Sequence, residues 1–507
     1  MRRLGLGLAS CAAVALTVLL LSQSDGEGSP HARAGLKPGV LVRVDPTQRS
    51  YRFRPGAVGL SIETLQISSG AVSPHDQSLV ALMRRLGPAT LRIGGNSADR
   101  SWWAGDGKAK PIWATNTVTP DDLSRLRGLL DATNWQAILT VNLGHFEPQR
   151  AADEARSATA ILGPRLRAVE VGNEPNAYGT SVEKLRPPSY NVDDYLRELS
   201  AYQTQILEQA PSVRFAGPDL SFSPSSHTWL PRIAEVSPSP FSEITHHYYP
   251  TSYNLPRGPC KRTPNPSAQD LLGPAAREYE NTLLGRVAAA GALAHRPTRI
   301  SETNTTSSCN TGGGPNTSPV FASALWALDW TLRAASSGVS GINFHGRLSG
   351  CLPTSFSPIC APRGQPSPQP VPVARPEYYG LLAARELEGG RFVPVTLQGP
   401  VASRGDLTAY ATERADGTLK VAIDDLSPHT GASLVAIAAP GYASGSMSRL
   451  AAPSIHATRR VTYGHATIGA GGADRPGSTP LRHEDGAFYL RSPAGSAQIL
   501  TLTPAPG

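Results

Sequence analysis

The chain has 507 residues, of which 40% are hydrophobic and 17% charged, and its formal net charge is +8. This composition excludes an intrinsically disordered chain, and the length allows one large globular core with a smaller companion domain. No Lys/Arg run with interleaved aromatic residues occurs, so nucleic-acid binding is not expected. A basic surface suits an acidic polysaccharide or a polyanionic cell wall.

The N-terminus has the layout of a secretory signal peptide. A basic start is followed by an apolar run over about residues 4–21 and then by a polar segment rich in Ser and Gly. We predict a leader over residues 1–34; an uncleaved anchor and a lipoprotein processed at Cys11 are the alternatives. No other apolar stretch approaches the roughly 20 residues that span a bilayer. The mature protein is therefore expected to be secreted or associated with the cell envelope, with no membrane contact after cleavage.

Four cysteines remain once the leader is removed, and an even number in an exported chain favours two disulfides over a metal site. Three pairings are open. The short spacing of Cys351 and Cys360 favours that pair, which leaves Cys260 with Cys309.

The first predicted strands, Val40–Val44 and Ser50–Phe53, are interpreted as a hairpin within residues 35–55. Short β-rich runs then alternate with longer helical stretches, as in parallel βα units. Strands are predicted at Val58–Ile62, Thr90–Ile93, Ala137–Val141, Ala168–Val171, Arg214–Ala216, Glu243–Thr245, Thr298–Ser301 and Gly341–Phe344. Helices are predicted at Asp121–Ala132, Val192–Gln209 and Val320–Ser337. Eight units indicate a (β/α)8 TIM barrel over residues 56–390.

After a further helix at Tyr378–Leu387, strands and turns follow without helices. Antiparallel strands are predicted at Leu407–Thr412, Leu419–Asp424, Ser433–Ala438 and Ala497–Thr501. We expect a C-terminal β-sandwich over residues 391–507, completed by the N-terminal hairpin. The predicted fold class is α/β.

Polar or glycine residues follow nearly every predicted barrel strand. They are Glu63, Gly94-Gly95-Asn96, Asn142, Asn173-Glu174, Asp219, His246-His247-Tyr248, Glu302 and His345. In a barrel these ends meet on one face, where active sites of this fold are built.

Glu174 and Glu302 follow the fourth and the seventh strand, on opposite sides of the predicted barrel mouth. Hydrolysis of a glycosidic bond needs one carboxylic acid to protonate the leaving oxygen and a second carboxylate as nucleophile or base. Both side chains are placed to reach one bond, so this pair predicts a glycosidase.

Several motifs carry a more specific resemblance. They are Leu-Arg-Ile-Gly-Gly-Asn (91–96), Val-Gly-Asn-Glu-Pro-Asn (171–176), His-His-Tyr-Tyr (246–249), Ser-Glu-Thr (301–303), Gly-Gly-Gly (312–314), Asn-Phe-His-Gly (343–346) and Pro-Glu-Tyr-Tyr-Gly (376–380). Asn-Glu-Pro after the fourth strand and a Glu after the seventh resemble clan A glycoside hydrolases, which are retaining (β/α)8 enzymes. The finer pattern resembles glycoside hydrolase family 79, the β-glucuronidase and heparanase family.

The resemblance implies roles for individual residues. Glu174 matches the general acid/base and Glu302 the nucleophile, while Asn173 matches an asparagine that binds the sugar 2-OH. Tyr248 matches a tyrosine that hydrogen-bonds the nucleophile. Glu63, Asn96 and His345 are expected to line the sugar-binding subsite. Adjacent histidines on a strand point to opposite faces, so His246 and His247 are not expected to share a metal, and no cofactor is expected.

The loop after the eighth strand departs from the family pattern. Family β-glucuronidases hold the sugar carboxylate with tyrosine hydroxyls and backbone amides of this loop, and here Phe356 stands where a tyrosine is expected. Arg347 is the substitute, since a guanidinium pairs well with a carboxylate; the alternative is a surface arginine.

We therefore predict a secreted, monomeric, retaining exo-β-glycosidase of β-glucuronidase type, whose partner is a carbohydrate substrate. An endo-glucuronidase and a clan A retaining glycosidase for a neutral sugar are alternatives. A carbohydrate-binding protein without catalysis is a further alternative, against which the presence of both glutamates argues.

Overall fold

The computed structural model describes residues 38–363, 371–401, 403, 405–427, 431–469, 471 and 475–506. The predicted leader, residues 1–34, lies outside the described residues. Within the described ranges, every helix is too short or too polar to span a membrane.

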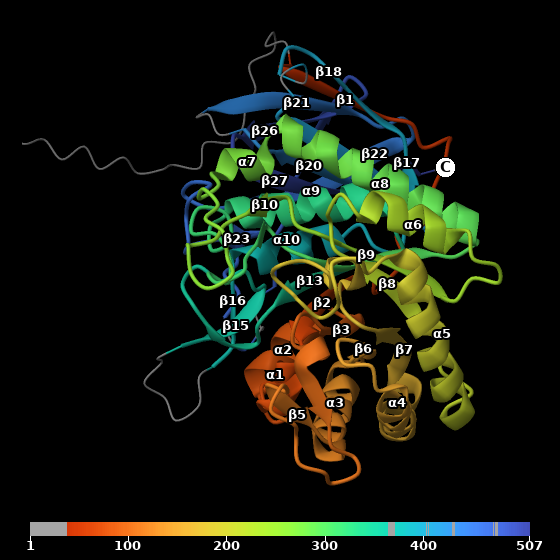
Figure 1. The fold of residues 1–507 in the computed structure, drawn as a ribbon. Coiled ribbons are helices and arrows are strands. Elements are labelled where there is room, and N and C mark those ends of the chain that lie inside the picture. Colours follow the sequence, from red (N-terminus) through yellow and green to blue (C-terminus); the bar gives the residue numbers. More distant parts are fainter. Residues whose placement is uncertain are drawn as a thin grey trace, which may run out of the picture. The chain divides into compact units, whose positions relative to one another are not determined.

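Eight parallel strands form a barrel, as predicted (Figure 1). They are β2 (Val58–Glu63), β3 (Thr90–Gly94), β6 (Gln136–Val141), β7 (Leu166–Val171), β8 (Ala216–Leu220), β9 (Glu243–Tyr248), β11 (Thr298–Thr303) and β13 (Gly341–Gly346). The order β7-β6-β3-β2-β13-β11-β9-β8 runs once around the barrel, and a bridge between Val169 and Phe215 joins its two ends. Most strand residues are buried because helices cover the outside and side chains fill the interior.

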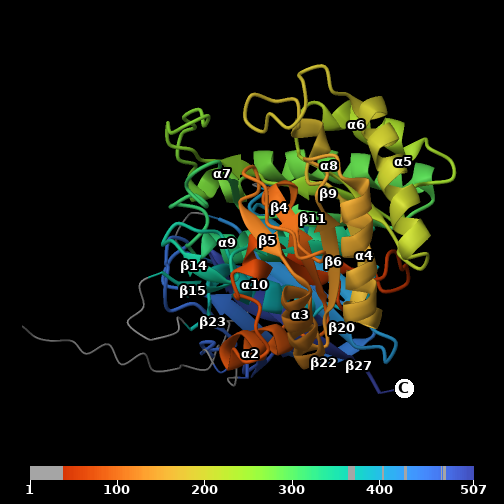
Figure 2. The same ribbon diagram turned by 60° about the horizontal axis from the view of Figure 1, so that its bottom comes forward.

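The helices lie outside the strands, and α3, α4 and α5 lie side by side in Figures 1 and 2. Their bounds are α1 (Leu65–Ser68), α2 (Gln77–Arg85), α3 (Pro120–Thr133), α4 (Pro148–Leu162), α5 (Val192–Gln209), α6 (Ser226–Ala234), α7 (Ala268–Leu272), α8 (Pro274–Ala294), α9 (Ala322–Ser336) and α10 (Pro376–Arg385). Side chains of Thr119 and Asn191 cap α3 and α5, and a carboxylate three residues later completes each capping box.

The fifth barrel strand begins later than predicted, at Ala216 instead of Arg214. The observed strand also continues through Gly217-Pro218, beyond the predicted end, although both residues are rare inside strands. In the structure the register of β8 against β9 shifts between Gly217 and Leu220. Pro218, which has no N–H group to donate, lies within this interruption of the ladder.

Three small sheets of short strands lie at the barrel mouth. They are β4 (Ser101–Trp103) with β5 (Asn116–Val118), β10 (Thr251–Ser252) with β12 (Thr306–Ser307), and β15 (Ile359–Pro362) between β14 (Ser349–Cys351) and β16 (Val373–Ala374). The predicted disulfide pairs, Cys260–Cys309 and Cys351–Cys360, are both present in this region.

Two further sheets form the predicted β-sandwich. One contains β18 (Val395–Gln398), β1 (Val40–Val44), β21 (Ala432–Ala438), β26 (Ala487–Pro493) and β25 (Arg482–Glu484); the other contains β17 (Arg391–Val393), β19 (Leu407–Glu413), β20 (Leu419–Asp425), β27 (Ser496–Pro504), β22 (Tyr442–Ala451), β23 (Thr462–Tyr463) and β24 (Thr479–Pro480). Side chains such as Val42, Val421 and Phe488 fill the space between them. Because neighbours on a strand face opposite ways, Ala422 and Ile499 pack instead against the barrel core, where α9 and α10 lie.

The N-terminal segment joins the sandwich differently from the prediction. Strand β1 lies between β18 and β21, as the red strand beside the blue ones in Figure 1 shows. Residues 50–53 do not pair with β1; Arg52 forms an isolated bridge with Arg391. The expected hairpin was therefore wrong in its pairing, because strands distant in sequence supply both edges of β1.

Candidate active site

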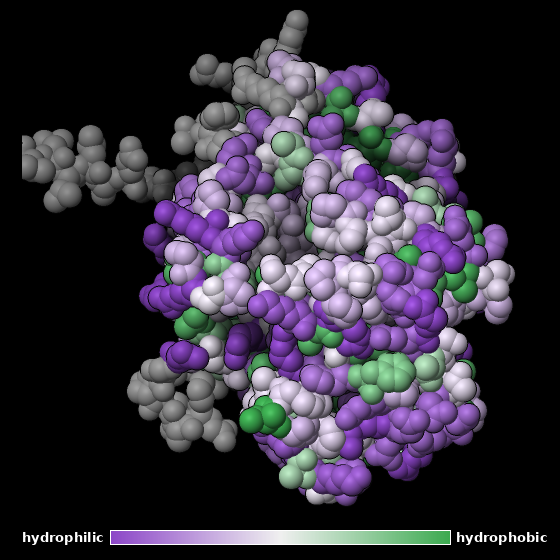
Figure 3. All heavy atoms as spheres, in the orientation of Figure 1, coloured by the Kyte–Doolittle hydropathy of each residue, from purple (hydrophilic) through white to green (hydrophobic). Residues whose placement is uncertain are grey.

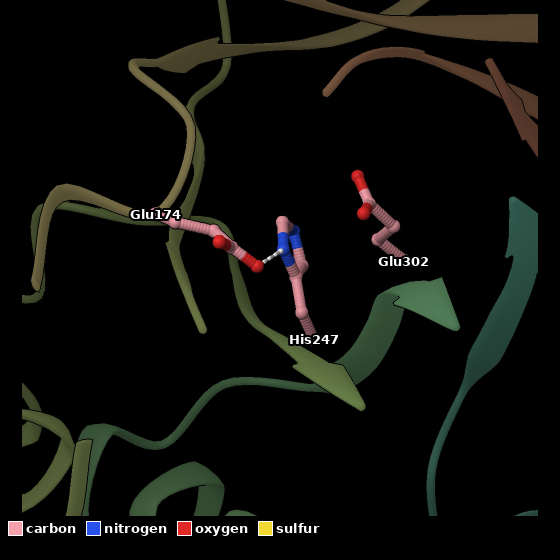
Figure 4. A group of neighbouring side chains, drawn as sticks. All are labelled: Glu174, His247 and Glu302. Carbon is pink, nitrogen blue, oxygen red and sulfur yellow. Dashed lines mark hydrogen bonds and ion pairs between the residues drawn. The ribbon is translucent and has the colours of Figure 1, made fainter. Parts of the chain in front are cut away.

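Glu174, His247 and Glu302 lie together at the barrel mouth, with His247 between the two carboxylates (Figure 4). A carboxylate oxygen of Glu174, one of Glu302 and a ring nitrogen of His247 all lie within 4.8 Å of one another. Glu302 lies near the end of strand β11, His247 lies on β9, and Glu174 follows β7. The barrel thus brings together side chains that are up to 128 residues apart in the sequence.

Glu302 is almost buried, with 7% of its surface exposed. Its Oε2 accepts a hydrogen bond from Arg92 Nη1 at 2.6 Å, and its Oε1 accepts one from the Tyr249 hydroxyl at 2.8 Å. Burial alone would raise the pKa of this carboxyl group. Electrostatic interactions with His345, His247 and Arg92 and the bond from Tyr249 outweigh burial and lower the pKa to about 2. Glu302 is therefore an ionised carboxylate.

Glu174 has the opposite electrostatic environment. Burial, helped by the charge of Glu302, raises its pKa, although a contact with His247 Nδ1 at 3.0 Å acts against this. The Glu174 backbone is left-handed, with φ at 53°, a conformation that is uncommon outside glycine. Its side chain stays 23% exposed, so it can reach a bound molecule.

His247 carries the positive charge between the carboxylates. Burial lowers its pKa, but Glu302, Asp219 and Glu174 together raise it to about 10. Its Nδ1 contacts Glu174 Oε1 at 3.0 Å and its Nε2 lies 3.3 Å from Asp219 Oδ1. A protonated imidazole has no lone pair for a metal, so the spacing of Glu174, His247 and Glu302 fits ion pairing better than cation binding.

Arg92 holds the base of the site from strand β3, with a side chain that is fully buried. Besides Glu302 it binds Glu170 Oε2 at 2.9 Å, Asp219 Oδ2 at 3.0 Å and Asn173 Oδ1 at 2.9 Å. Burial and the Asp219 charge hold the pKa of Glu170 well above its usual value, and Arg92 holds that of Asp219 well below.

The predicted sugar-binding residues Glu63, Asn96, Asn173 and His345 come together around this network. Glu63 accepts hydrogen bonds from the backbone N–H and hydroxyl of Ser97, and its Oε1 lies 3.7 Å from His345 Nε2. His345 Nδ1 lies 3.6 Å from Glu302 Oε2. Asn173 Nδ2 donates to Asn96 Oδ1 at 3.1 Å. Polar groups thus surround the space next to Glu302.

The prediction that Tyr248 hydrogen-bonds Glu302 was wrong by one residue. Tyr248 is buried on the outer side of β9, where its ring packs against Phe222 and Trp330. Tyr249, just beyond the strand, donates to Glu302. Neighbouring residues of an extended chain face opposite sides, so choosing the wrong tyrosine of the pair reverses the side chain's direction.

The two residues of the loop after β13 have different surroundings. The Arg347 side chain is exposed, and among the described residues it makes no ion pair. The Phe356 ring lies 5.9 Å from the rings of both Tyr249 and His345. Phe356 thus borders the residues around Glu302, whereas Arg347 lies in solvent.

Sequence reasoning missed the contributions of Arg92, Asp219, His247 and Tyr249. All four lie inside or directly beside segments that had been singled out as motifs or strand ends, so their position was a usable signal. Nothing in the sequence signalled which of these side chains contact one another, because each contact joins different strands of the barrel.

No family model matches the chain. A β-glucuronidase of Aspergillus niger is 24% identical over 292 residues, which are 53% of this chain and 49% of that protein. A solved structure of a 4-O-α-L-rhamnosyl-β-D-glucuronidase from Fusarium oxysporum 12S has a TM-score of 0.72 and 20% identity, over 91% of this chain and 100% of the other. The resemblance to glycoside hydrolase family 79 is confirmed.

A GH51 arabinofuranosidase from Xanthomonas axonopodis pv. citri has a TM-score of 0.64 and 16% identity, over 92% of this chain and all of the other. At such identities the solved structures show the fold, a barrel with a C-terminal sandwich. The chain spans about half the length of the curated family 79 relative that it matches.

Proposed function

We propose that the chain is a secreted retaining β-glycosidase of β-glucuronidase type, with Glu302 as nucleophile and Glu174 as general acid/base. The observation that carries the proposal is the pair of carboxylates with oxygens within 4.8 Å of each other. Carboxyl groups roughly 5–5.5 Å apart are typical of retaining glycosidases, and a separation of about 6.5–9.5 Å of inverting ones. The opposite pKa shifts of the two groups support the division of roles.

In the first step the Glu302 carboxylate attacks the anomeric carbon while Glu174 gives its proton to the leaving oxygen. A glycosyl-enzyme ester forms at Glu302, and the glycosidic bond breaks. Arg92 and Tyr249 keep the attacking carboxylate ionised and aligned. Asn173 binds the sugar 2-OH.

In the second step water replaces Glu302 at the anomeric carbon. Esterification removes the negative charge of Glu302, and that charge is one of the causes that raise the pKa of Glu174. The pKa of Glu174 therefore falls, so the carboxylate left by the first step stays ionised, and as general base it accepts a proton from the attacking water. The ester breaks, and the sugar leaves with its original anomeric configuration.

A screen of 4-nitrophenyl β-glycosides, including the glucuronide, glucoside, xyloside and galactoside, tests the proposal. We expect release of nitrophenol from the glucuronide, and proton NMR of the first product formed should show the β-anomer. Binding without turnover of any glycoside would favour a non-catalytic carbohydrate-binding protein instead.

A second candidate is a retaining clan A glycosidase for a neutral sugar. Two observations favour it: Phe356, beside Tyr249 and His345, has no hydroxyl group to donate, and the Arg347 side chain is exposed. A neutral sugar needs no cationic partner in the reacting subsite.

The variants Arg347→Ala and Phe356→Tyr separate the two candidates. If Arg347 binds the sugar carboxylate, Arg347→Ala should lower kcat/KM for the glucuronide by about 10- to 100-fold, the range for a hydrogen bond to a charged group. A β-glucoside should be affected far less, and Phe356→Tyr should raise glucuronide turnover. A wild-type preference for the glucoside, with equal losses on both substrates in Arg347→Ala, would establish the neutral-sugar candidate.

Tyr249→Phe and Tyr248→Phe form a matched pair that tests the corrected tyrosine. Tyr249→Phe removes the bond to Glu302, so we expect kcat to fall by roughly 10- to 100-fold and the acid limb of the pH profile to move to higher pH. Tyr248→Phe should leave kcat within about twofold, because its hydroxyl group touches no residue of the site. Equal losses in both variants would contradict the assignment.

A further inference from the structure

A polar pocket of about 440 Å³ lies at the barrel mouth, next to the residues of the proposed mechanism. Such a volume is in the range of small-molecule sites. The pocket is lined by Asn96 and Arg100 after β3, Val182 and Glu183 after β7, Asn254 after β9, and Cys309 after β11. It is thus built by loops from four strands of the barrel.

Two observations put this pocket on the Glu174 side of the site. Asn96, in its wall, accepts the hydrogen bond of Asn173, the residue before Glu174. Glu183, also in its wall, is close enough for its charge to add to burial in raising the pKa of Glu174. The general acid protonates the leaving oxygen, so the group on that oxygen departs on this side.

The lining favours a neutral, hydroxyl-rich ligand. The two charged lining residues, Arg100 and Glu183, neutralise each other, since Arg100 Nη2 binds Glu183 Oε2 at 2.8 Å. Amide, guanidinium, carboxylate and hydroxyl groups together offer both donors and acceptors. Among the described residues no aromatic ring lines the pocket, so a flat aromatic group finds nothing to stack on.

The wall formed by the loops after β9 and β11 is firmly held. The Cys260–Cys309 disulfide joins the two loops, and Asn254 Oδ1 accepts the Cys309 N–H at 2.5 Å. Asn310 forms hydrogen bonds of 3.1 and 2.6 Å with the Leu255 backbone. A pre-formed wall loses little freedom when a ligand binds.

We infer that this pocket is the subsite for the leaving group, and that the leaving group is a neutral sugar. The inference rests on the proposed function and deepens it: the enzyme releases its sugar from a glycan, and not from an aromatic aglycone. Arg257, Lys261 and Arg262 are exposed on the loop that carries Pro259, another lining residue, so a charged leaving sugar is the competing outcome.

The experiment compares two substrates that share the reacting sugar selected by the chromogenic screen. One is the β-glycosyl fluoride, whose fluoride leaving group does not occupy the pocket. The other is the disaccharide with the highest kcat/KM in a panel that has glucose or galactose as the leaving sugar. Val182→Trp fills the pocket from an exposed position, and Leu207→Trp is the matched control on the last turn of α5, at the far end of the barrel. Val182 and Leu207 are 45% and 41% exposed.

We expect Val182→Trp to lower the ratio of kcat/KM for the disaccharide to kcat/KM for the fluoride at least tenfold, and Leu207→Trp to keep it within twofold. A ratio unchanged in Val182→Trp overturns the subsite. No measurable turnover of any disaccharide by the wild-type chain overturns the inference that the leaving group is a sugar. No turnover of fluoride or chromogenic substrate overturns the proposed function itself.

Charge selectivity is tested with a disaccharide whose leaving sugar is a uronic acid. The wild-type chain should prefer the neutral disaccharide. A tenfold preference for the acidic disaccharide overturns the inference that the leaving sugar is neutral. Glu183→Gln provides a second variant that needs no bulky side chain. It leaves the Arg100 charge uncompensated, so relative turnover of the acidic disaccharide should rise about two- to fivefold. An unchanged preference in Glu183→Gln shows that the pair does not face the leaving sugar and overturns the subsite.

Discussion

Glu302→Ala should lower kcat on all glycosides on the order of 10⁵-fold or more, as expected when a covalent catalyst loses its nucleophile. Glu174→Ala should behave differently. With a 2,4-dinitrophenyl glycoside, whose leaving group needs little protonation, the first step should proceed and the second should slow by about 10²- to 10⁴-fold. The glycosyl-enzyme should then accumulate, and mass spectrometry should find the added sugar on the peptide that contains Glu302.

Azide identifies the roles through the product it forms. In Glu174→Ala it should attack the glycosyl-enzyme, restore turnover and give the β-glycosyl azide. In Glu302→Ala it can only displace the leaving group directly, which gives the α-glycosyl azide. If NMR finds the opposite anomers, the roles of the two glutamates are reversed.

The pH profile of kcat/KM supplies an independent check on the same pair. Activity needs Glu302 ionised and Glu174 protonated. The profile should therefore have an acid limb near pH 2 from Glu302 and a basic limb above the ordinary glutamate value of 4.5 from Glu174. The basic limb should disappear in Glu174→Ala. A basic limb that persists in this variant belongs to another group.

The second large effect is expected from Arg92→Met. This change removes the counter-charge of two buried carboxylates, Asp219 and Glu302. Breaking a buried ion pair from one side costs about 3–5 kcal/mol, so the free energy of unfolding at pH 7, measured by urea denaturation, should fall by that amount. Activity should fall as well, because the pKa of Glu302 rises when Arg92 is absent.

The stability deficit of Arg92→Met should depend on pH in a defined direction. The pKa values of Asp219 and Glu302 lie below their ordinary values of 3.8 and 4.5 in the folded state. Groups of this kind stabilise the fold above their unfolded pKa, and the stabilisation is lost as the pH falls through the folded pKa. The difference between wild type and variant should therefore shrink from pH 4.5 down to about 2.

Arg299→Met is the matched control. Arg299 is also buried on a barrel strand, but its side chain binds Glu243 and Asn343 instead of the carboxylates at the mouth. We expect a comparable loss of stability with the acid limb of the activity profile unchanged. If both variants shift the acid limb equally, the shift follows from lost stability, and Arg92 has no specific effect on the pKa of Glu302.

The amino-acid sequence by itself predicted most helices and strands of this protein and the position of Glu174 and Glu302 at the ends of barrel strands. Apolar runs bounded by turns predicted the eight barrel strands, since each strand is buried on both faces and needs such a run. Helix α5 was predicted at Val192–Gln209, its observed bounds, because its cap and its amphipathic pattern are local features. Glu174 and Glu302 were identifiable because the end of a strand is a local position, and parallel strands must present those ends on one face.

Only the tertiary structure decided which side chains meet. Arg92 contacts four residues that lie on or directly after three other strands, and no spacing along the chain records that. The choice between Tyr248 and Tyr249 depended on where β9 ends, because a shift of one residue turns a side chain from the barrel mouth to the helix layer. The partners of β1 were equally non-local: β18 and β21 follow it by more than 350 residues, and pairing between strands is set by packing across the whole sandwich.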